Sequence, residues 1–254
     1  MFQPSTASSR SAASSSCLSD LITAIGEKLT HFNMSSNKMA GLPFIFKAIS
    51  VSSPLLDHSG KTLIISLQQH SKNLRVLDVS NISTTSRDTI LINIEKLQKG
   101  CPKLTKLRTT NTMLGLNEVP VREQMASPGF PFLEELTVGV DQRGYFDGMD
   151  DQQIERILKK SNRLKVLDIR GCKGINDSTL VRLPCWDIEY LYVAGCSVTS
   201  SSRDGLELLV KKWCRTLQDL DIGNTTDNKT VDWAVMALVE NEEYIRLRCG
   251  MQTI

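Results

Sequence analysis

No stretch of the sequence reaches the roughly eighteen consecutive apolar residues that a membrane-spanning helix needs. An excess of charge is also missing, because 30 Lys and Arg residues are balanced by 28 Asp and Glu residues and the formal net charge is +2. Surfaces that bind nucleic acid or acidic membranes usually carry a clear basic excess. We therefore expect neither nucleic acid nor a membrane as the main partner.

Recognisable catalytic and metal-binding motifs are missing as well. The seven cysteines include no Cys-x-x-Cys pair, and the three histidines are not spaced with Cys or carboxylates as in a zinc site or a catalytic triad. A glycine-rich phosphate loop is absent. The acidic loop 139–151 lacks the ligand spacing of a calcium loop, so we interpret it as an extended loop. The sequence predicts a protein that is not an enzyme and needs no metal or cofactor.

The beginning of the chain lacks the apolar segment of a secretory signal peptide. Residues 1–17 form a tract rich in serine and alanine, which we expect to be a disordered tail because so little of it can be buried. Without an export signal, the cysteines are expected to be reduced thiols, which places the protein in the cytoplasm or the nucleus.

The sequence does contain a repeat. Seven stretches share the form L-x-x-L-x-L, and they begin at Leu29, Leu74, Leu104, Leu133, Leu164, Ile188 and Leu217. From Leu104 onward, successive starts lie 29, 31, 24 and 29 residues apart. This spacing is close to the period of about 20–29 residues in leucine-rich repeats. We expect an irregular repeat near 54–73 and a shortened eighth strand in the last unit.

Each repeat reads as a strand, a turn and a helix. The alternating L-x-L core predicts a short strand with one buried face. Because no unit can bury its own apolar face, the units are expected to stack over residues 18–254 into an α/β leucine-rich-repeat solenoid. Strands would line the concave side and helices the convex side. Apolar residues at helical spacing predict the helices within 88–100, 151–160, 203–214 and 229–241.

Two cysteines occupy the same place in their repeats, because Cys172 follows Leu164 by eight residues and Cys196 follows Ile188 by eight. A metal ligand, a nucleophile and a structural residue are the possible readings. A small polar side chain at that place turns inward to meet backbone groups of the adjacent repeat, and a cysteine packs there as a small hydrophobe with a weak donor. No base accompanies either cysteine in sequence, so we interpret both as structural. We also interpret the three tryptophans as packing residues: Trp186, Trp213 and Trp233.

The unit C-x-x-I-N-D-x-x-L-x-x-L that begins at Cys172 is followed by PCWDIEYLYVAGC, and together they resemble the cysteine-containing leucine-rich repeats of F-box proteins. The resemblance is carried most by LVRLPCWDIEYLYVAG and KKWCRTLQDLDIG, between about 161 and 233. It implies a module that recruits protein substrates to an SCF-type ubiquitin ligase for proteasomal degradation. In that family, a separate F-box domain holds a Skp-type adaptor and, through it, a cullin.

No F-box is visible in this chain. Residues 41–50, GLPFIFKAIS, share only a Leu-Pro and an Ile-Phe with an F-box opening and occupy the place of the first repeat's helix. A Skp-type adaptor and a cullin are therefore expected as partners only of a longer form that carries an F-box. The alternative function is a stand-alone leucine-rich-repeat scaffold or inhibitor without a role in ubiquitin transfer.

The positions between the inward leucines are expected to face the concave surface and to bind a protein substrate. The last three strands give the most promising patch, because tyrosine and arginine are enriched at interface hot spots. An aromatic pair with carboxylates nearby would suit a partner segment that carries Lys or Arg, in part through cation–π contact. The predicted partner-binding residues are Lys106, Arg108, Asp168, Arg170, Tyr190, Tyr192, Asp219 and Asp221.

Overall fold

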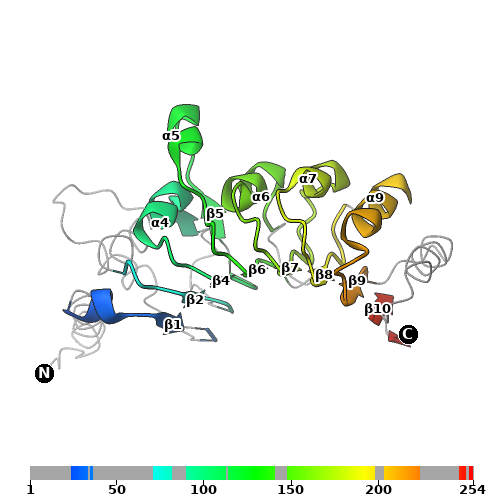
Figure 1. Ribbon diagram of the computed structural model, residues 1–254, viewed down its shortest axis with the longest axis horizontal. Helices are drawn as coiled ribbons and strands as arrows, with labels where there is room; N and C mark the ends of the chain where they lie inside the picture. Colours follow the sequence, from blue (N-terminus) through cyan, green and yellow to red (C-terminus); the bar gives the residue numbers. More distant parts are fainter. Residues whose placement is uncertain are drawn as a thin grey trace, which may run out of the picture.

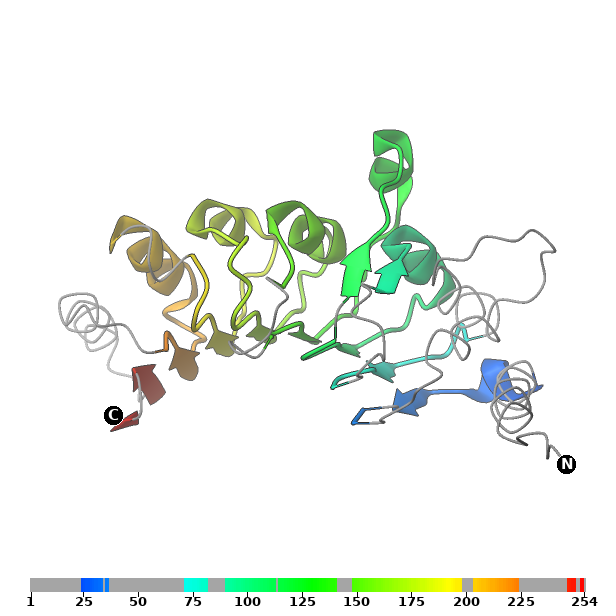
Figure 2. The same cartoon turned by 180° about the vertical axis from the view of Figure 1, so that it is seen from behind.

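The structure is a computed structural model. It describes residues 24–33, 35–36, 71–81, 90–112, 114–140, 148–197, 203–223, 246–249 and 252–253. These residues form a curved layer of short strands with helices on its outer side (Figure 1). The view from behind shows the same two layers, with the strands on the inside of the curve (Figure 2).

All seven predicted strands are present and lie side by side in chain order. The sheet runs β1-β2-β4-β6-β7-β8-β9-β10-β11, and its neighbours are parallel except for β11, which pairs antiparallel with β10. The predicted eighth strand is therefore β10. The strands are β1 (His31–Asn33), β2 (Val76–Asp78), β4 (Lys106–Arg108), β6 (Glu135–Thr137), β7 (Val166–Asp168), β8 (Tyr190–Tyr192), β9 (Asp219–Asp221), β10 (Arg246–Cys249) and β11 (Gln252–Thr253).

The register of the sheet follows from the motif itself. From β2 to β10, the middle leucine of each strand pairs with the middle leucine of the next, as in Leu136↔Leu167↔Leu191, and in β1 Phe32 takes that place. From β2 to β9, these leucines and the first residue of each motif are buried, and Leu133, Leu136, Leu164 and Leu167 have no exposed surface, whereas Leu29 and Phe32 of the first repeat are only partly buried. Burying one such side chain stabilises the stack by about 1.5–3 kcal/mol relative to leaving it exposed. The chain is an α/β leucine-rich-repeat solenoid.

Helices cover the convex side, and side-chain oxygens fix where three of them begin. Asn93, Asp150 and Asn176 each accept a hydrogen bond from the backbone N–H three residues later, which satisfies a group that the first helical turn leaves without a partner. The helices are α4 (Ile94–Gly100), α5 (Val121–Ala126), α6 (Asp151–Leu158), α7 (Asp177–Arg182) and α9 (Arg203–Trp213), with a short 3-10 helix, η1 (Gly26–Lys28), before β1.

The helix predicted over 88–100 was wrong in its first part. Ile90–Ile92 is a strand, β3, which pairs in parallel with β5 (Leu114–Leu116). A run of β-branched and apolar residues fits a buried strand as well as a buried helix, and the partner strand decided between them. After β5 the chain continues into α5, which stands out from the row of convex helices (Figure 1).

The structural reading of Cys172 and Cys196 is confirmed. Both side chains are buried, and each thiol donates to a backbone carbonyl of the preceding repeat: Cys172 Sγ to Val138 O at 3.6 Å and Cys196 Sγ to Ile169 O at 2.9 Å. Thr112, eight residues after Leu104, makes the same contact to Val79 O at 2.6 Å. A short side chain with a hydrogen-bond donor at this position thus links each of these repeats to the preceding one.

The prediction for the tryptophans was correct for Trp213 and wrong for Trp186. Trp213 is 1% exposed and donates its indole N–H to Cys185 O, whereas Trp186 is 66% exposed on the outer flank beside Lys212. Several other predictions lie outside the described residues: the tail 1–17, the stretch 41–50, residues 54–70 of the irregular repeat, and the helix 229–241 with Trp233.

Candidate protein-binding surface

The sheet brings all eight predicted partner-binding residues to one face. From β2 to β9 the middle leucine of each strand is buried against the helices, so the first and third residues point to the concave side. The first positions form one row across the sheet and the third positions form a second row. The first row contains Lys106, Glu135, Val166, Tyr190 and Asp219, and the second contains Arg108, Thr137, Asp168, Tyr192 and Asp221.

Arg170 is the centre of the C-terminal half of this face. Its Nε donates to Asp168 Oδ1 at 2.9 Å and its Nη2 to Asp168 Oδ2 at 2.6 Å. Its guanidinium lies 5.3 Å from the centroid of the Tyr192 ring, and Nη1 is 3.7 Å from Asp221 Oδ2. The hydrogen bonds to Asp168 raise the pKa of Arg170, and Asp221 adds to the shift. These contacts hold Arg170 in one orientation on the concave face.

The aspartates of this patch also have a structural role that the sequence analysis did not assign. Oδ1 of Asp78, Asp168 and Asp221 each accepts a hydrogen bond from the backbone N–H two residues later, at 3.0, 3.2 and 3.0 Å. Such Asx turns end a strand and turn the chain toward the convex side. Asp168 is only 4% exposed and Asp219 only 3%. The carboxylate most open to a partner is therefore Asp221.

The cation that a partner was expected to place beside the tyrosines is supplied by the chain itself. Arg170 already stacks on Tyr192 and pairs with Asp168. The first tyrosine is engaged differently: the Tyr190 hydroxyl donates to Gln218 Oε1 at 3.0 Å. Asp219 lies 3.7 Å from Arg246 of β10. The predicted residues are thus together, but much of their charge is compensated within the surface.

The N-terminal half of the face holds a second compensated cluster around Glu135. Arg108 Nε donates to Glu135 Oε1 at 2.5 Å, Lys106 Nζ lies 3.1 Å from Oε2, and Arg108 Nη1 is 3.8 Å from Asp78 Oδ2. Burial alone would raise the pKa of Glu135, but the hydrogen bonds from Arg108 and Lys106 bring it below its ordinary value. Lys106 and Arg108 are therefore ion-pair partners within the sheet as well as surface residues.

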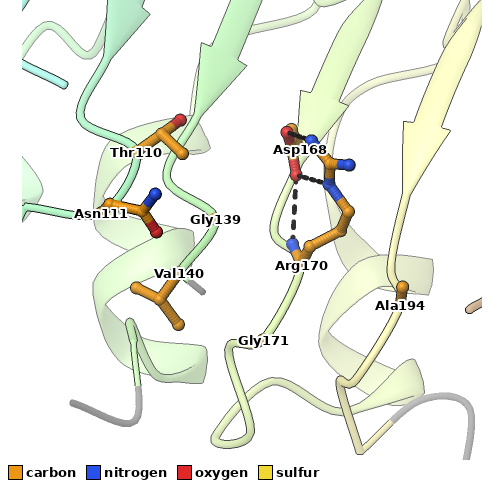
Figure 3. Close-up of a pocket in the computed structure, with 8 residues that line it drawn as sticks. All are labelled: Thr110, Asn111, Gly139, Val140, Asp168, Arg170, Gly171 and Ala194. Atoms are coloured by element: carbon orange, nitrogen blue, oxygen red, sulfur yellow. Dashed lines mark hydrogen bonds and ion pairs between the residues drawn. The ribbon is translucent and has the colours of Figure 1, made fainter. Parts of the chain in front are cut away.

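A hollow of about 280 Å³ lies at the carboxyl end of the strands, next to Arg170 (Figure 3). It was not predicted, although the sequence carries a signal for it. Small residues follow the strands at Gly139 and Ala194, where the neighbouring repeats have Thr110 and Arg170. The lining residues are Thr110, Asn111, Gly139, Val140, Asp168, Arg170, Gly171 and Ala194.

Two observations concern metal binding and thiol reactivity among the described residues. No group of three or more His, Cys, Asp or Glu side chains among them could hold a metal ion. Burial raises the pKa of Cys172 to about 11 and that of Cys196 to about 12, so both thiols are protonated at neutral pH. Within the described parts of the chain, no helix is long and apolar enough to cross a membrane.

Comparison with known proteins adds a structural likeness. No family model matches the chain, and no curated protein is similar to it in sequence. Among solved structures, it is similar to a chain in the crystal structure of the Rad7 and Elc1 complex in yeast, with 14% sequence identity and a TM-score of 0.48. The match covers 83% of this chain and 53% of the other, so this chain spans about half the length of that one.

Proposed function

We propose that this chain is a protein-recognition module that binds a partner protein on its concave face. The observation that carries the proposal is the gathering of two tyrosines on β8 with an oriented arginine on the turn after the adjacent strand β7. Arg170 has 45% of its side chain exposed. Rigid aromatic and arginine side chains of this kind dominate the energy of protein interfaces.

Within this proposal, the more specific role is substrate recognition for an SCF-type ubiquitin ligase. It is supported by the resemblance of the repeats between about 161 and 233 to those of F-box/leucine-rich-repeat protein six. Adaptor binding would require an F-box in a longer form of the protein. Five cysteines are reduced thiols, which fits a cytoplasmic or nuclear location: Cys101, Cys172, Cys185, Cys196 and Cys214.

Site-specific photo-cross-linking in cells tests the binding role. A photoreactive residue is placed at Tyr192 on the concave face or, as a control, at Val121 on α5, which is 72% exposed on the convex side. We expect discrete protein adducts from position 192, and we expect Tyr192→Ala to weaken capture of that partner while the far-ultraviolet circular dichroism stays unchanged. Equal adducts from both positions, or none from position 192, would contradict the proposal.

The same experiment separates the ubiquitin role from the stand-alone role. If the captured partner is ubiquitinated and a Skp-type adaptor co-purifies with the longest expressed form, the substrate-receptor role is supported. If the partner is captured but its lifetime and ubiquitination do not depend on this protein, the scaffold or inhibitor role is the better description.

A further inference from the structure

The hollow beside Arg170 extends across four consecutive repeats. It is lined by the residues that follow β4, β6, β7 and β8: Thr110 and Asn111, Gly139 and Val140, Arg170 and Gly171, and Ala194. Adjacent strands lie about 4.8 Å apart, so four repeats span about 14 Å. An extended polypeptide advances about 3.4 Å per residue, so about four residues of a partner segment would fit along it.

The open floor of this hollow is required by the fold. A Cβ atom on Gly139 would lie 2.8 Å from Asp168 Oδ1, in the way of the carboxylate that holds Arg170. Gly171 has a φ of +74°, and a Cβ there would overlap the carbonyl oxygen of Val140. Side chains are thus excluded at Gly139 and Gly171, and the hollow lies between Thr110 on one side and Arg170 on the other (Figure 3).

Arg170 has hydrogen-bonding capacity left over. Its guanidinium carries five N–H donors. Two of them go to Asp168, and the 3.7 Å contact between Nη1 and Asp221 is too long for a hydrogen bond. Toward the described residues, three donors of Arg170 therefore make no hydrogen bond. Because Asp168 and Tyr192 fix the guanidinium, a ligand would lose little conformational entropy in meeting these donors.

The charge next to the hollow selects what kind of acceptor can bind. Asp168 and Asp221 outweigh Arg170, which leaves this cluster with a net charge of −1. A carboxylate or a phosphate would meet an arginine whose charge is already compensated and a nearby excess of negative charge. A neutral acceptor, such as a backbone carbonyl, is not repelled by this negative charge.

We infer that the hollow binds an extended, non-acidic segment of the partner protein across the ends of the strands, with Arg170 donating hydrogen bonds to its backbone carbonyls. This inference rests on the proposed function and adds to it where on the concave face the partner lies and what charge its binding segment has. Tyr190 and Tyr192 border the segment on the strand side.

The experiment uses a displayed library of random linear peptides selected on the full chain, followed by affinity measurements on one selected peptide. Two variants fill the hollow from opposite ends, Thr110→Tyr and Ala194→Leu. Val121→Tyr makes a matched aromatic substitution on α5, outside the concave face. A third test, Arg170→Lys, keeps the charge but removes the planar array of donors.

The inference predicts selected peptides that lack acidic residues in their central positions. Both hollow-filling variants should bind the peptide at least about tenfold more weakly, since each would displace hydrogen bonds to a charged donor. Arg170→Lys should also bind it more weakly, and Val121→Tyr should bind it normally. The melting temperature of each variant shows whether it has kept its fold. Because Thr110→Tyr and Ala194→Leu change different repeats, one folded variant of the two is sufficient for the test.

Selection of acidic peptides, or full affinity in the folded hollow-filling variants, would overturn the inference. A library without any binder that depends on Arg170 would overturn it as well. Failure here is distinguishable from failure of the proposed function. If position 192 still cross-links a partner in cells while Thr110→Tyr and Ala194→Leu capture it normally, the concave face binds protein but the hollow does not.

Discussion

A buried ion pair on the convex side offers the sharpest test of how this solenoid is held together. Arg156 of α6 donates two hydrogen bonds to Glu95 of α4, Nε to Oε1 and Nη2 to Oε2, both at 2.9 Å. Nη2 also donates to Asn117 O at 2.9 Å. The Glu95 side chain is 2% exposed and the Arg156 side chain 14% exposed. One guanidinium thus joins three successive repeats at the point where β5 and α5 replace a regular convex helix.

The two single substitutions should differ in cost. Arg156→Leu leaves the Glu95 carboxylate buried without its partner and also removes the donor to Asn117, so we expect a loss of about 3–5 kcal/mol in the free energy of unfolding. Glu95→Leu leaves an arginine that keeps its bond to Asn117 and is partly exposed, so about 1–3 kcal/mol is expected. The double variant removes both charges together and should lie within about 2 kcal/mol of the unchanged chain.

Urea unfolding followed by circular dichroism measures these differences, and the fluorescence of buried Trp213 reports on the C-terminal repeats. The decisive quantity is the coupling between the two substitutions. If the losses of the single variants simply add in the double variant, or if Glu95→Leu is the more damaging change, the pair does not act as a buried ion pair and the reasoning is wrong. The slope of the transition must stay unchanged for the comparison to hold, since a repeat array can lose cooperativity.

Two further predictions concern the interior of the stack. The thiols of Cys172 and Cys196 should resist alkylation in the folded chain below about pH 9 and react fully in urea. Folding raises the pKa of Cys172 from 9.0 to about 11 and that of Cys196 from 9.0 to about 12. The free energy of unfolding should therefore fall as the pH rises from about 9 toward 12. Rapid alkylation of both in the folded state would show that they are not buried. Gly171→Ala should lower the melting temperature through a cost of at least about 1 kcal/mol, since its φ is +74° and the new Cβ would meet Val140 O; an unchanged melting temperature would contradict the turn geometry.

The strands and their register could be predicted because one motif determines both. From β2 to β9, a buried leucine in the middle of each strand places the same position opposite itself in the next repeat, as with Leu136 and Leu167. The ladder position of Cys172 and Cys196 followed from the same spacing. The β3–β5 pair could not be predicted in this way, because the pairing of Ile90–Ile92 with Leu114–Leu116 depends on contacts across 24 residues, and the local pattern fits a helix equally well.

On the concave face, the sequence was sufficient to place the predicted residues together, but not to predict the hydrogen bonds and ion pairs that they form with one another. Trp186 shows the same limit on the outer flank, since it lies two residues before the first apolar residue of its repeat, Ile188, and the motif does not specify the direction of its side chain. For the aspartates a usable signal exists. Asp78, Asp168 and Asp221 all follow the middle leucine of a strand, and each accepts the N–H of the residue two positions later. When an acidic residue recurs at that position of the repeat, it indicates a turn more directly than a contact with another molecule.

The double role of these aspartates bears on how the concave face can acquire specificity. Asp168 ends its strand with Oδ1 and orients Arg170 with both carboxylate oxygens, so replacing it would disturb the turn and the guanidinium together. Arg170 itself ends no strand, and its side chain reaches the surface where its remaining donors lie. Substitution can therefore change the proposed binding residues, such as Arg170 and Ala194, while the aspartates keep the repeats in place. On the proposed function, such a surface would distinguish partners by the shape of the hollow and by directed hydrogen bonds, since most of its charge is already paired within the sheet.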